Sequence, residues 1–361
     1  MPDRSESPGS VLVGMSGGVD SSTAAALLVE AGYRVVGVML RLWSLDGAEG
    51  DNRCCAPDAV LQARQAAAQL KIPFYVVDAR EAFHQIVVCS FIEGLRRGIT
   101  PNPCYVCNQK FRWDTLLQQA AAMNLDWVAT GHYARIRRSP RGGVELLRGV
   151  DGHKDQSYML CGLRREQLER TLFPLGNFYK DEVRQKARSL DLPCAEREES
   201  QDLCFLGSQD IRGFIERYAP EVLQPGLILD RQGKMMGKHA GLALYTIGQR
   251  KGLGVSSHKP LYVLQKDVAS GALIVGHEED LGQSEFSVAE VNWIRGSAPK
   301  EPLAVSVKIR YQAVEVKAEV IPLPDQKAHV RLATRLRDIT PGQVAAFYQG
   351  ENCLGGGIIQ V

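Results

Sequence analysis

Hydrophobic runs and helix-forming stretches alternate along the first half of the chain. Four apolar runs have the length of buried strands: residues 11–15, 35–40, 74–77 and 127–130. Two stretches between them are rich in helix-forming side chains: residues 23–30 and 59–70. Strands that alternate with helices predict a parallel sheet covered by helices on both faces. We therefore expect a Rossmann-like α/β domain at the N-terminus.

The pattern changes after about residue 208. Glycine and proline become frequent, and short apolar segments follow at close spacing: residues 261–264, 272–275, 305–309, 314–320, 328–332 and 344–347. Many short strands separated by turn signals are typical of a small β-barrel. The sequence thus predicts an α/β domain, a small central domain and a C-terminal β-barrel, spanning residues 1–207, 208–284 and 285–361.

Composition indicates an ordinary globular protein. Of the 361 residues, 45% are hydrophobic and 23% are charged, and the net charge is only +2, so a nucleic-acid partner would have to bind local basic patches. Residues 1–10 are polar, and no apolar run reaches membrane-spanning length, so we expect a cytoplasmic protein. Nine cysteines, an odd number, argue for reduced thiols rather than a disulfide framework.

A glycine-rich loop follows the first predicted strand. Residues 14–22 read Gly-Met-Ser-Gly-Gly-Val-Asp-Ser-Ser, and Gly17 and Gly18 let backbone N–H groups approach an anion closely. Ser16 and Ser21 add hydroxyls, and Asp20 can hold Mg²⁺ or orient the loop. The loop lacks the Gly-Lys-Ser/Thr ending of a Walker A motif and the Gly-x-Gly-x-x-Gly of a dinucleotide site.

The same edge of the sheet should carry two further neighbours of a nucleotide. Leu40 ends the second predicted strand and Gly131 follows the fourth. Ligands of open α/β sheets bind beyond the carboxyl ends of the strands, so both residues are candidates for contact with the adenosine. Ordinary packing at a strand end explains them equally well.

Two cysteines stand in unusual surroundings. Pro101 and Pro103 precede Cys107 and predict that no helix begins before Gln109, which would place the Cys107 thiol near a helix N-terminus that favours the thiolate. Cys204 lies close to the predicted domain boundary. One thiolate could carry a persulfide sulfur and the other could release it by forming a disulfide. Burial of Cys204 beside Phe205 as a core residue is the alternative.

Several segments together resemble one known family. They are residues 14–22, 100–108, 129–133, 154–158, 204–207, 245–254 and 353–357. In order and over nearly the whole chain they resemble the tRNA-specific 2-thiouridylase family, and residues 16–21 resemble the phosphate loop of the PP-loop ATPases. The resemblance implies ATP-dependent adenylation of the wobble uridine of tRNA, followed by sulfur transfer to C2, with AMP and pyrophosphate released.

The resemblance also implies roles for particular residues. Cys107 and Cys204 would be catalytic, with Cys204 as the persulfide carrier. Contacts with ATP are implied for Gly14, Met15, Ser16, Gly17, Gly18, Val19, Asp20, Ser21, Leu40 and Gly131. Contacts with the target base are implied for Asn102, Pro103 and Cys104. Contacts with tRNA are implied for His132, Lys154, Asp155, Gln156, Arg310, Tyr311 and Gln343. The implied partners are tRNA and a sulfur donor such as a cysteine desulfurase or sulfur-relay protein, and the implied cofactors are ATP and Mg²⁺.

The sequence departs from the family at Cys104, where many members have aspartate. A carboxylate role therefore cannot be assigned here. Cys104, Cys107 and Cys204 could instead hold a [4Fe–4S] cluster with one open iron, an alternative to redox-active thiols. Cys54 and Cys55 could add ligands or simply fill a loop. Zinc is disfavoured, because no second Cys-x-x-Cys or histidine pair completes a tetrahedral set.

Two other classes of protein compete with this interpretation. An amide-forming ligase of the GMP-synthetase type would share the phosphate loop but would have no use for paired cysteines. A non-catalytic, metal-binding RNA-associated protein would not need pyrophosphate recognition. Basic clusters such as Arg250 with Lys251 suit RNA phosphates, although a solvated surface explains any one of them.

Overall fold

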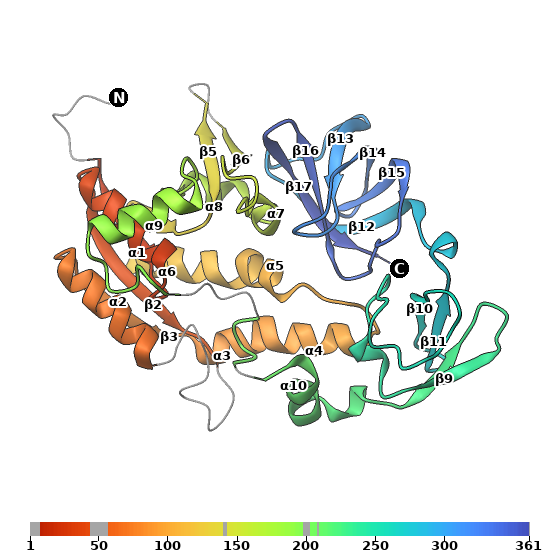
Figure 1. Ribbon diagram of the computed structural model, residues 1–361. Coiled ribbons are helices and arrows are strands. Elements are labelled where there is room, and N and C mark those ends of the chain that lie inside the picture. Colours follow the sequence, from red (N-terminus) through yellow and green to blue (C-terminus); the bar gives the residue numbers. More distant parts are fainter. Residues whose placement is uncertain (1–7, 44–56, 140–142, 198–202, 208, 361) are drawn as a thin grey trace.

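The computed structural model describes residues 8–43, 57–139, 143–197, 203–207 and 209–360 (Figure 1). It has an N-terminal α/β domain, a small central domain and a C-terminal β-barrel, as the sequence predicted. Within the described ranges, no helix has the length and apolarity needed to cross a membrane. Cys54 and Cys55 lie outside the described residues.

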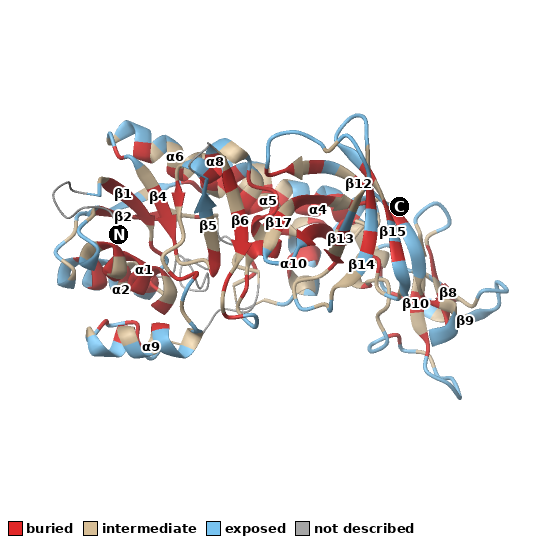
Figure 2. Cartoon of the chain, turned by 90° about the horizontal axis from the view of Figure 1, so that it is seen from above, coloured by how far each residue is buried: buried red, intermediate tan, exposed pale blue. Residues whose placement is uncertain are grey.

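A five-stranded parallel sheet with the order β3-β2-β1-β4-β7 organises the N-terminal domain. Its strands are β1 Ser10–Gly14, β2 Arg34–Arg41, β3 Phe74–Asp78, β4 Trp127–Thr130 and β7 Thr171–Leu172. The main helices are α1 Val19–Glu30, α2 Pro57–Gln69, α6 Trp113–Ala122 and α9 Lys180–Ser189. Figure 2 shows buried strands between helices whose outer faces are exposed.

Alternation of side chains along the central strand divides the apolar interior into two layers. Val11 and Val13 pack with α1, α2 and α9 on one face, while Leu12 packs with α6 on the other. This two-sided burial explains why the strands read as continuous apolar runs. The predicted strands are confirmed. Helix α1 begins at Val19 rather than at residue 23, because Gly18 in an extended conformation occupies the N-cap position.

A helical layer lies beyond the carboxyl edge of the sheet. Its elements are α3 Arg80–Phe83, the π-turn η1 His84–Val88, α4 Cys89–Arg96, α5 Pro103–Cys107 and the π-turn η2 Asn108–Arg112, which runs on into α6. The prediction that no helix begins before Gln109 is wrong. Pro103 is the first helical residue, a position where proline needs no N–H, and Asn102 caps the helix by accepting a hydrogen bond from the Tyr105 N–H at 3.1 Å.

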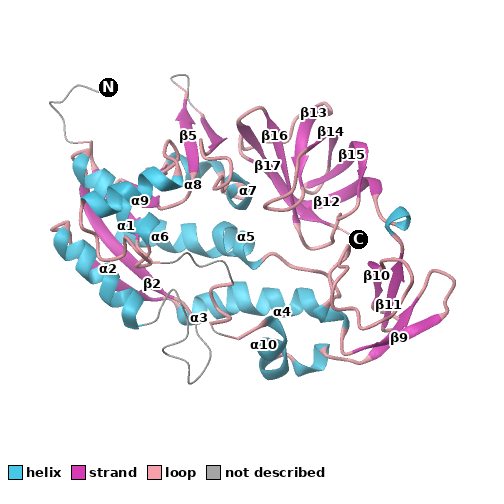
Figure 3. Ribbon diagram, viewed as in Figure 1, coloured by secondary structure: helices cyan, strands magenta, loops and turns pink. Residues whose placement is uncertain are grey.

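The central and C-terminal parts are built from strands (Figure 3). The central sheet has the order β10-β11-β8-β9, with β8 Gly226–Leu229, β9 Met235–His239, β10 Tyr262–Asp267 and β11 Ala272–Gly276. The barrel strands are β12 Gln283–Trp293, β13 Leu303–Lys308, β14 Val316–Leu323, β15 Lys327–Leu336, β16 Val344–Gln349 and β17 Asn352–Ile359. Pairing of β12 with β17 closes the barrel and removes its free edges.

The remaining helices are short. They are α7 Ser157–Leu160, α8 Arg165–Glu169, α10 Ile211–Tyr218 and the 3₁₀ turns Pro220–Val222, Leu242–Leu244 and Glu278–Asp280. The predicted domain boundaries at residues 207 and 284 stay predictions.

A hairpin from the N-terminal domain continues the barrel sheet. Strands β5 Ala134–Arg138 and β6 Val144–Arg148 form the hairpin, and β6 pairs with β17 through Leu147 opposite Asn352. One apolar core also contains residues from both units, including Leu146 and Tyr348. The barrel is therefore joined to the α/β domain by shared sheet and shared core.

Candidate active site

One cavity of about 580 Å³ lies where the sheet, the helical layer and the barrel meet. The phosphate loop and the three candidate cysteines all line it. Its lining includes Ser16, Gly18, Val19, Asp20, Ser21, Pro103, Cys104, Cys107, Arg112, His132, Tyr133, Lys154, Gln156, Lys180, Arg197, Cys204 and Tyr311. Nucleotide and thiol candidates that are far apart in the sequence thus share one space.

The glycine loop has a conformation that only glycine tolerates well. Gly17 has φ +72°, and an added Cβ would lie 2.2 Å from the carbonyl oxygen of Ala59. The Ser21 hydroxyl accepts a hydrogen bond from the Ser16 N–H at 3.1 Å and donates to the Gly18 carbonyl at 3.2 Å. The loop is thereby tied back on the first turn of α1.

Gly131 packs directly on this loop. An added Cβ on Gly131 would lie 2.7 Å from the backbone nitrogen of Ser21. The other predicted nucleotide contacts are in less direct positions: Met15 is buried, Gly14 ends β1, and Leu40 lies in β2 opposite Val77. None of these three is among the residues that line the cavity.

Asp20 is held by two side chains from other elements. The Lys180 Nζ lies 2.7 Å from Asp20 Oδ1, and the Tyr133 hydroxyl donates to the same oxygen at 2.8 Å. Lys180 is the first residue of α9, which packs against α1. The carboxylate is therefore fixed in place and partly neutralised by a cation that also faces the cavity.

The cavity is rich in positive charge. Its described lining carries four cationic side chains, Arg112, Lys154, Lys180 and Arg197, against the single carboxylate of Asp20. The Arg197 Nη1 donates to the Gly17 carbonyl at 2.9 Å and so braces the glycine loop. In a chain with a net charge of only +2, this concentration creates a local field that attracts polyanions.

Sequence reasoning missed Lys180, Arg197, Arg112 and Tyr133 as site residues. Tyr133 lies inside the family-like segment 129–133, but nothing in the sequence marks its hydroxyl as a partner of Asp20. Lys180 and Arg197 lie in unremarkable polar stretches. Tyr133, Lys180 and Arg197 reach the glycine loop only through tertiary contacts that span more than a hundred residues of sequence. A single sequence holds no signal for such contacts.

The three cysteines differ in exposure. Cys104 is exposed, Cys204 is half-buried, and Cys107 is buried in a cluster with Phe111 and Phe205. Cys107 lies in the second turn of the helix that starts at Pro103, and Cys104 is nearer its beginning, so the predicted position of Cys107 at a helix N-terminus is wrong. The thiols nevertheless share the cavity with the glycine loop.

The described residues do not form a preformed metal site. No three side chains of histidine, cysteine, aspartate or glutamate in this part of the chain come together as ligands of a metal ion. Cys104, Cys107 and Cys204 line one cavity, but in the part of the chain that the structure describes they do not form a ready set of three metal ligands. The iron–sulfur alternative stays a prediction.

His132 lies on the floor of the cavity in an apolar setting. Its ring packs 5.4 Å from Trp113 and 6.3 Å from Phe173, measured between ring centroids, and its Nδ1 lies 2.8 Å from the Thr130 hydroxyl. Burial, with the nearby Arg112 guanidinium, lowers the pKa of His132 to about 3. The imidazole is neutral at physiological pH and can offer a hydrogen bond but no charge.

The predicted tRNA contacts fall into two groups. His132, Lys154, Gln156 and Tyr311 line the cavity, as do Pro103 and Cys104 beside the capping Asn102. Asp155, by contrast, is buried. Arg310 donates to the carbonyl of Ile247 at 3.1 Å and Gln343 donates to the carbonyl of Thr100 at 2.8 Å, so both lie where domains meet.

Sequence comparisons extend these observations to the whole chain. Residues 9–208 match the family described as "tRNA methyl transferase HUP domain", residues 212–277 match "tRNA methyl transferase PRC-barrel domain", and residues 283–359 match "Aminomethyltransferase beta-barrel domain". The protein named "tRNA-specific 2-thiouridylase MnmA" from Magnetococcus marinus is 46% identical over 98% of this chain and 99% of its own length. The protein of that name from Chloroflexus aggregans is 46% identical over 97% and 98%.

Comparison with solved structures gives only distant likenesses. NMN synthetase from Francisella tularensis aligns with a TM-score of 0.38 at 18% identity, covering 57% of this chain and 72% of its own. A 4-thiouridine synthetase–RNA complex with bound ATP aligns with a TM-score of 0.35 at 14% identity, covering 58% and 49%. Scores this low carry no functional argument, so the assignment rests on the sequence relatives.

Proposed function

Because this chain belongs to the tRNA-specific 2-thiouridylase family, we propose that it uses ATP to activate the wobble uridine of tRNA and replaces the C2 oxygen with sulfur. The single observation that carries the proposal is the shared cavity, in which Cys107 and Cys204 line the same space as the glycine loop. Activation and sulfur delivery must occur at the same carbon, so both sets of groups have to reach it.

The first step is adenylation. The glycine loop, with Lys180 and Arg197 close by, suits the negative charge of a triphosphate, and the 2.7 Å pair between Lys180 and Asp20 fixes the loop beside it. The uridine O2 attacks the α-phosphorus of ATP, and the bond to the pyrophosphate leaving group breaks. Asp20 would hold a Mg²⁺ ion that accompanies the phosphates.

The second step is sulfur transfer. An outside donor first loads Cys204 as a persulfide. The terminal sulfur then attacks C2 of the adenylated uridine, and AMP leaves with the former O2. Attack of the Cys107 thiolate on the inner sulfur of Cys204 releases the terminal sulfur and leaves a Cys107–Cys204 disulfide. A dithiol reductant must supply two electrons before the next turnover.

The basic lining supports RNA as the substrate. Lys154 and Arg112 add positive charge to the cavity that the thiols also line, and Tyr311 offers a ring on which an unstacked base can lie. Asn102, Pro103 and Cys104 border the position expected for the target base, while Arg310 and Gln343 extend the contact region towards the barrel. The family description refers to methyl transfer, but a methyl donor would give no function to two thiols beside a phosphate loop.

A reconstituted reaction tests the proposal. Purified protein is incubated with ATP, Mg²⁺, a tRNA transcript, a dithiol, and a cysteine desulfurase with cysteine as sulfur source. AMP and pyrophosphate are quantified, and digested tRNA is analysed for 2-thiouridine by mass spectrometry. We expect both AMP and 2-thiouridine to require tRNA. AMP formation without tRNA would point to a ligase, and no AMP at all would exclude catalysis of this kind.

The same preparation distinguishes redox thiols from an iron–sulfur cluster. Protein purified without oxygen is examined by ultraviolet–visible absorption and iron analysis before the assay. Thiolation by iron-free protein supports the persulfide route. Stoichiometric iron, with activity that is lost on chelation, would contradict it.

A further inference from the structure

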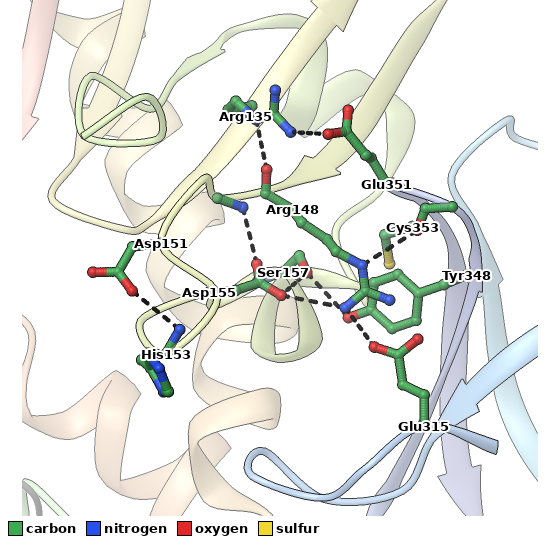
Figure 4. A network of polar contacts seen from close by, with 12 residues as sticks. Arg135, Arg148, Asp151, His153, Asp155, Ser157, Glu315, Tyr348, Glu351 and Cys353 are labelled. Carbon is green, nitrogen blue, oxygen red and sulfur yellow. Dashed lines mark hydrogen bonds and ion pairs between the residues drawn. The ribbon is translucent and has the colours of Figure 1, made fainter. Parts of the chain in front are cut away.

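A largely buried arginine joins the barrel to a loop that lines the cavity (Figure 4). Arg148 is the last residue of β6, and its side chain is 20% exposed. Its guanidinium carbon lies 3.6 Å from the centroid of the Tyr348 ring, and its Nη1 lies 2.6 Å from Glu315 Oε1. Both of these partners belong to the C-terminal barrel segment, so Arg148 is one of the polar contacts between the two units, beside the 3.0 Å contact between the Ser157 and Tyr348 hydroxyls.

On its other side Arg148 faces Asp155. The Asp155 carboxylate is 3% exposed and lies 3.6 Å from the Arg148 Nη1. It also accepts hydrogen bonds from the N–H groups of Gly149 and Ser157, each at 3.1 Å, and from the Ser157 hydroxyl at 2.9 Å. Residues 149–157 are thus folded around one buried carboxylate, whose charge these three hydrogen bonds and the Arg148 guanidinium stabilise.

The far side of this loop reaches the nucleotide end of the cavity. Lys154 and Gln156 line the cavity, and the Gln156 side-chain oxygen accepts from the Tyr133 N–H at 3.0 Å. Asp151 Oδ2 accepts from the Lys180 N–H at 3.0 Å, and the Lys180 ammonium holds Asp20. A continuous set of polar contacts therefore runs from Glu315 through Arg148 and this loop to the glycine loop.

We propose that Arg148 is a positioning residue for tRNA recognition: it fixes loop 149–156 so that Lys154 is held towards the substrate. The inference rests on the proposed function. The two units already share an apolar core and a sheet, so Arg148 is not needed merely to join them. A buried ion pair adds little net stability but imposes a specific geometry, and that geometry is what the loop requires.

A double-mutant cycle tests the proposal. Arg148→Met keeps an unbranched apolar side chain but removes the charge and the hydrogen bonds. We expect the dissociation constant for tRNA to rise about tenfold, while the dissociation constant for ATP measured without tRNA stays within about twofold. In a Lys154→Ala background the effect of Arg148→Met should vanish, because the loop no longer presents a cation to hold in place.

Control variants separate positioning from general damage. Arg250→Ala removes an exposed cation from the central domain, and its effect on tRNA affinity should add to that of Arg148→Met. Arg148→Lys should restore most of the affinity, since it keeps the charge beside Asp155. If Arg148→Met does not fold, Glu315→Gln tests the same role. We expect it to weaken tRNA binding about threefold, and this effect should also disappear in a Lys154→Ala background.

Two results would overturn the role of Arg148. In the first, the effect of Arg148→Met, or of Glu315→Gln, on tRNA affinity simply adds to the effect of Lys154→Ala. The other is an equal loss of ATP and tRNA affinity together with a lower Tm. A wild-type protein that forms no AMP with tRNA would instead overturn the proposed function, and that measurement does not depend on Arg148.

Discussion

The two ends of the cavity are built in different ways. At the nucleotide end, short polar contacts fix nearly every group: Lys180 and Tyr133 hold Asp20, and Arg197 braces Gly17. At the thiol end, the surroundings are aromatic and apolar, with Cys107 and Phe205 in one cluster and Cys104 open to solvent. Phosphate binding needs preorganised donors, whereas sulfur transfer needs a thiol that can meet first a donor and then a base. The contrast predicts that variants at the two ends fail in different steps.

The largest effect is expected at the thiol end. Cys204→Ser removes the proposed persulfide carrier and should lower the rate of 2-thiouridine formation by about a thousandfold or more, because oxygen cannot carry a sulfane sulfur. The dissociation constant for ATP should not change. Calorimetry and the mass-spectrometric assay measure the two quantities.

Cys89→Ser is the matched control for this variant. Cys89 is a half-buried thiol of helix α4 that does not line the cavity, and its replacement should leave thiolation intact. Normal thiolation by Cys204→Ser would remove the distinction between the two ends, since the carrier would then lie elsewhere.

The next largest effect concerns the conformation of the glycine loop. Gly17→Ala places a Cβ 2.2 Å from the Ala59 carbonyl at φ +72°, and we expect the free energy of unfolding to fall by roughly 2–4 kcal/mol, with loss of ATP binding. Urea unfolding and calorimetry measure both.

Gly233→Ala separates the cost of backbone strain from the cost of steric overlap with a neighbouring group. Gly233 has φ +81° but nothing within 4 Å of an added Cβ, so its replacement should cost only about 1 kcal/mol and should not change ATP affinity. If Gly17→Ala and Gly233→Ala reduced the free energy of unfolding equally, backbone strain alone, rather than close packing, would determine the conformation of the glycine loop.

A smaller effect is expected for the cation at Asp20. Lys180→Met should weaken ATP binding about tenfold, since it removes a positive charge from the cavity and leaves the Asp20 carboxylate to repel phosphates. Lys186→Met, on the same helix, removes a surface ion pair with Glu30 and should have no effect on ATP affinity. Equal ATP affinity for Lys180→Met and wild type would mean that the nucleotide end is not preorganised by this pair.

The smallest effect concerns pH and His132. Its pKa is about 3 in the folded protein and about 6.5 when unfolded, so below pH 6.5 the unfolded chain takes up a proton that the folded protein does not. Stability contributed by the neutral ring is therefore present above pH 6.5 and lost as pH falls. When the pH falls from 7.5 to 5.5, the free energy of unfolding of wild type should decrease by about 1 kcal/mol more than that of His132→Gln, as measured by urea unfolding.

Exposed His258 supplies the comparison for this measurement. His258→Gln should leave the pH dependence of unfolding as it is in wild type. An unchanged pH dependence in His132→Gln would show that the floor of the cavity is wetter than its contacts with Trp113 and Phe173 indicate.

Much of the fold could be predicted because local pattern and burial agree. The four parallel strands were expected from continuous apolar runs, and β4 has the predicted limits at Trp127 and Thr130. The start of α5 was missed because proline was interpreted only as a helix breaker, although at the first helical position it costs nothing. The roles of individual site residues stay predictions. Those of Arg310 and Gln343 are examples, since each side chain donates a hydrogen bond to a backbone carbonyl of another domain.

The sequence by itself determined the family, the main strands of the sheet and the chemistry available, because glycines, cysteines and apolar periodicity act locally and are visible in the residue string. Only the tertiary structure decided which cations surround the phosphate loop and that Arg148 ties the barrel to the cavity. The physical reason is that an ion pair or a packed guanidinium depends on side chains far apart in the chain meeting at a few ångströms. No single sequence records that distance.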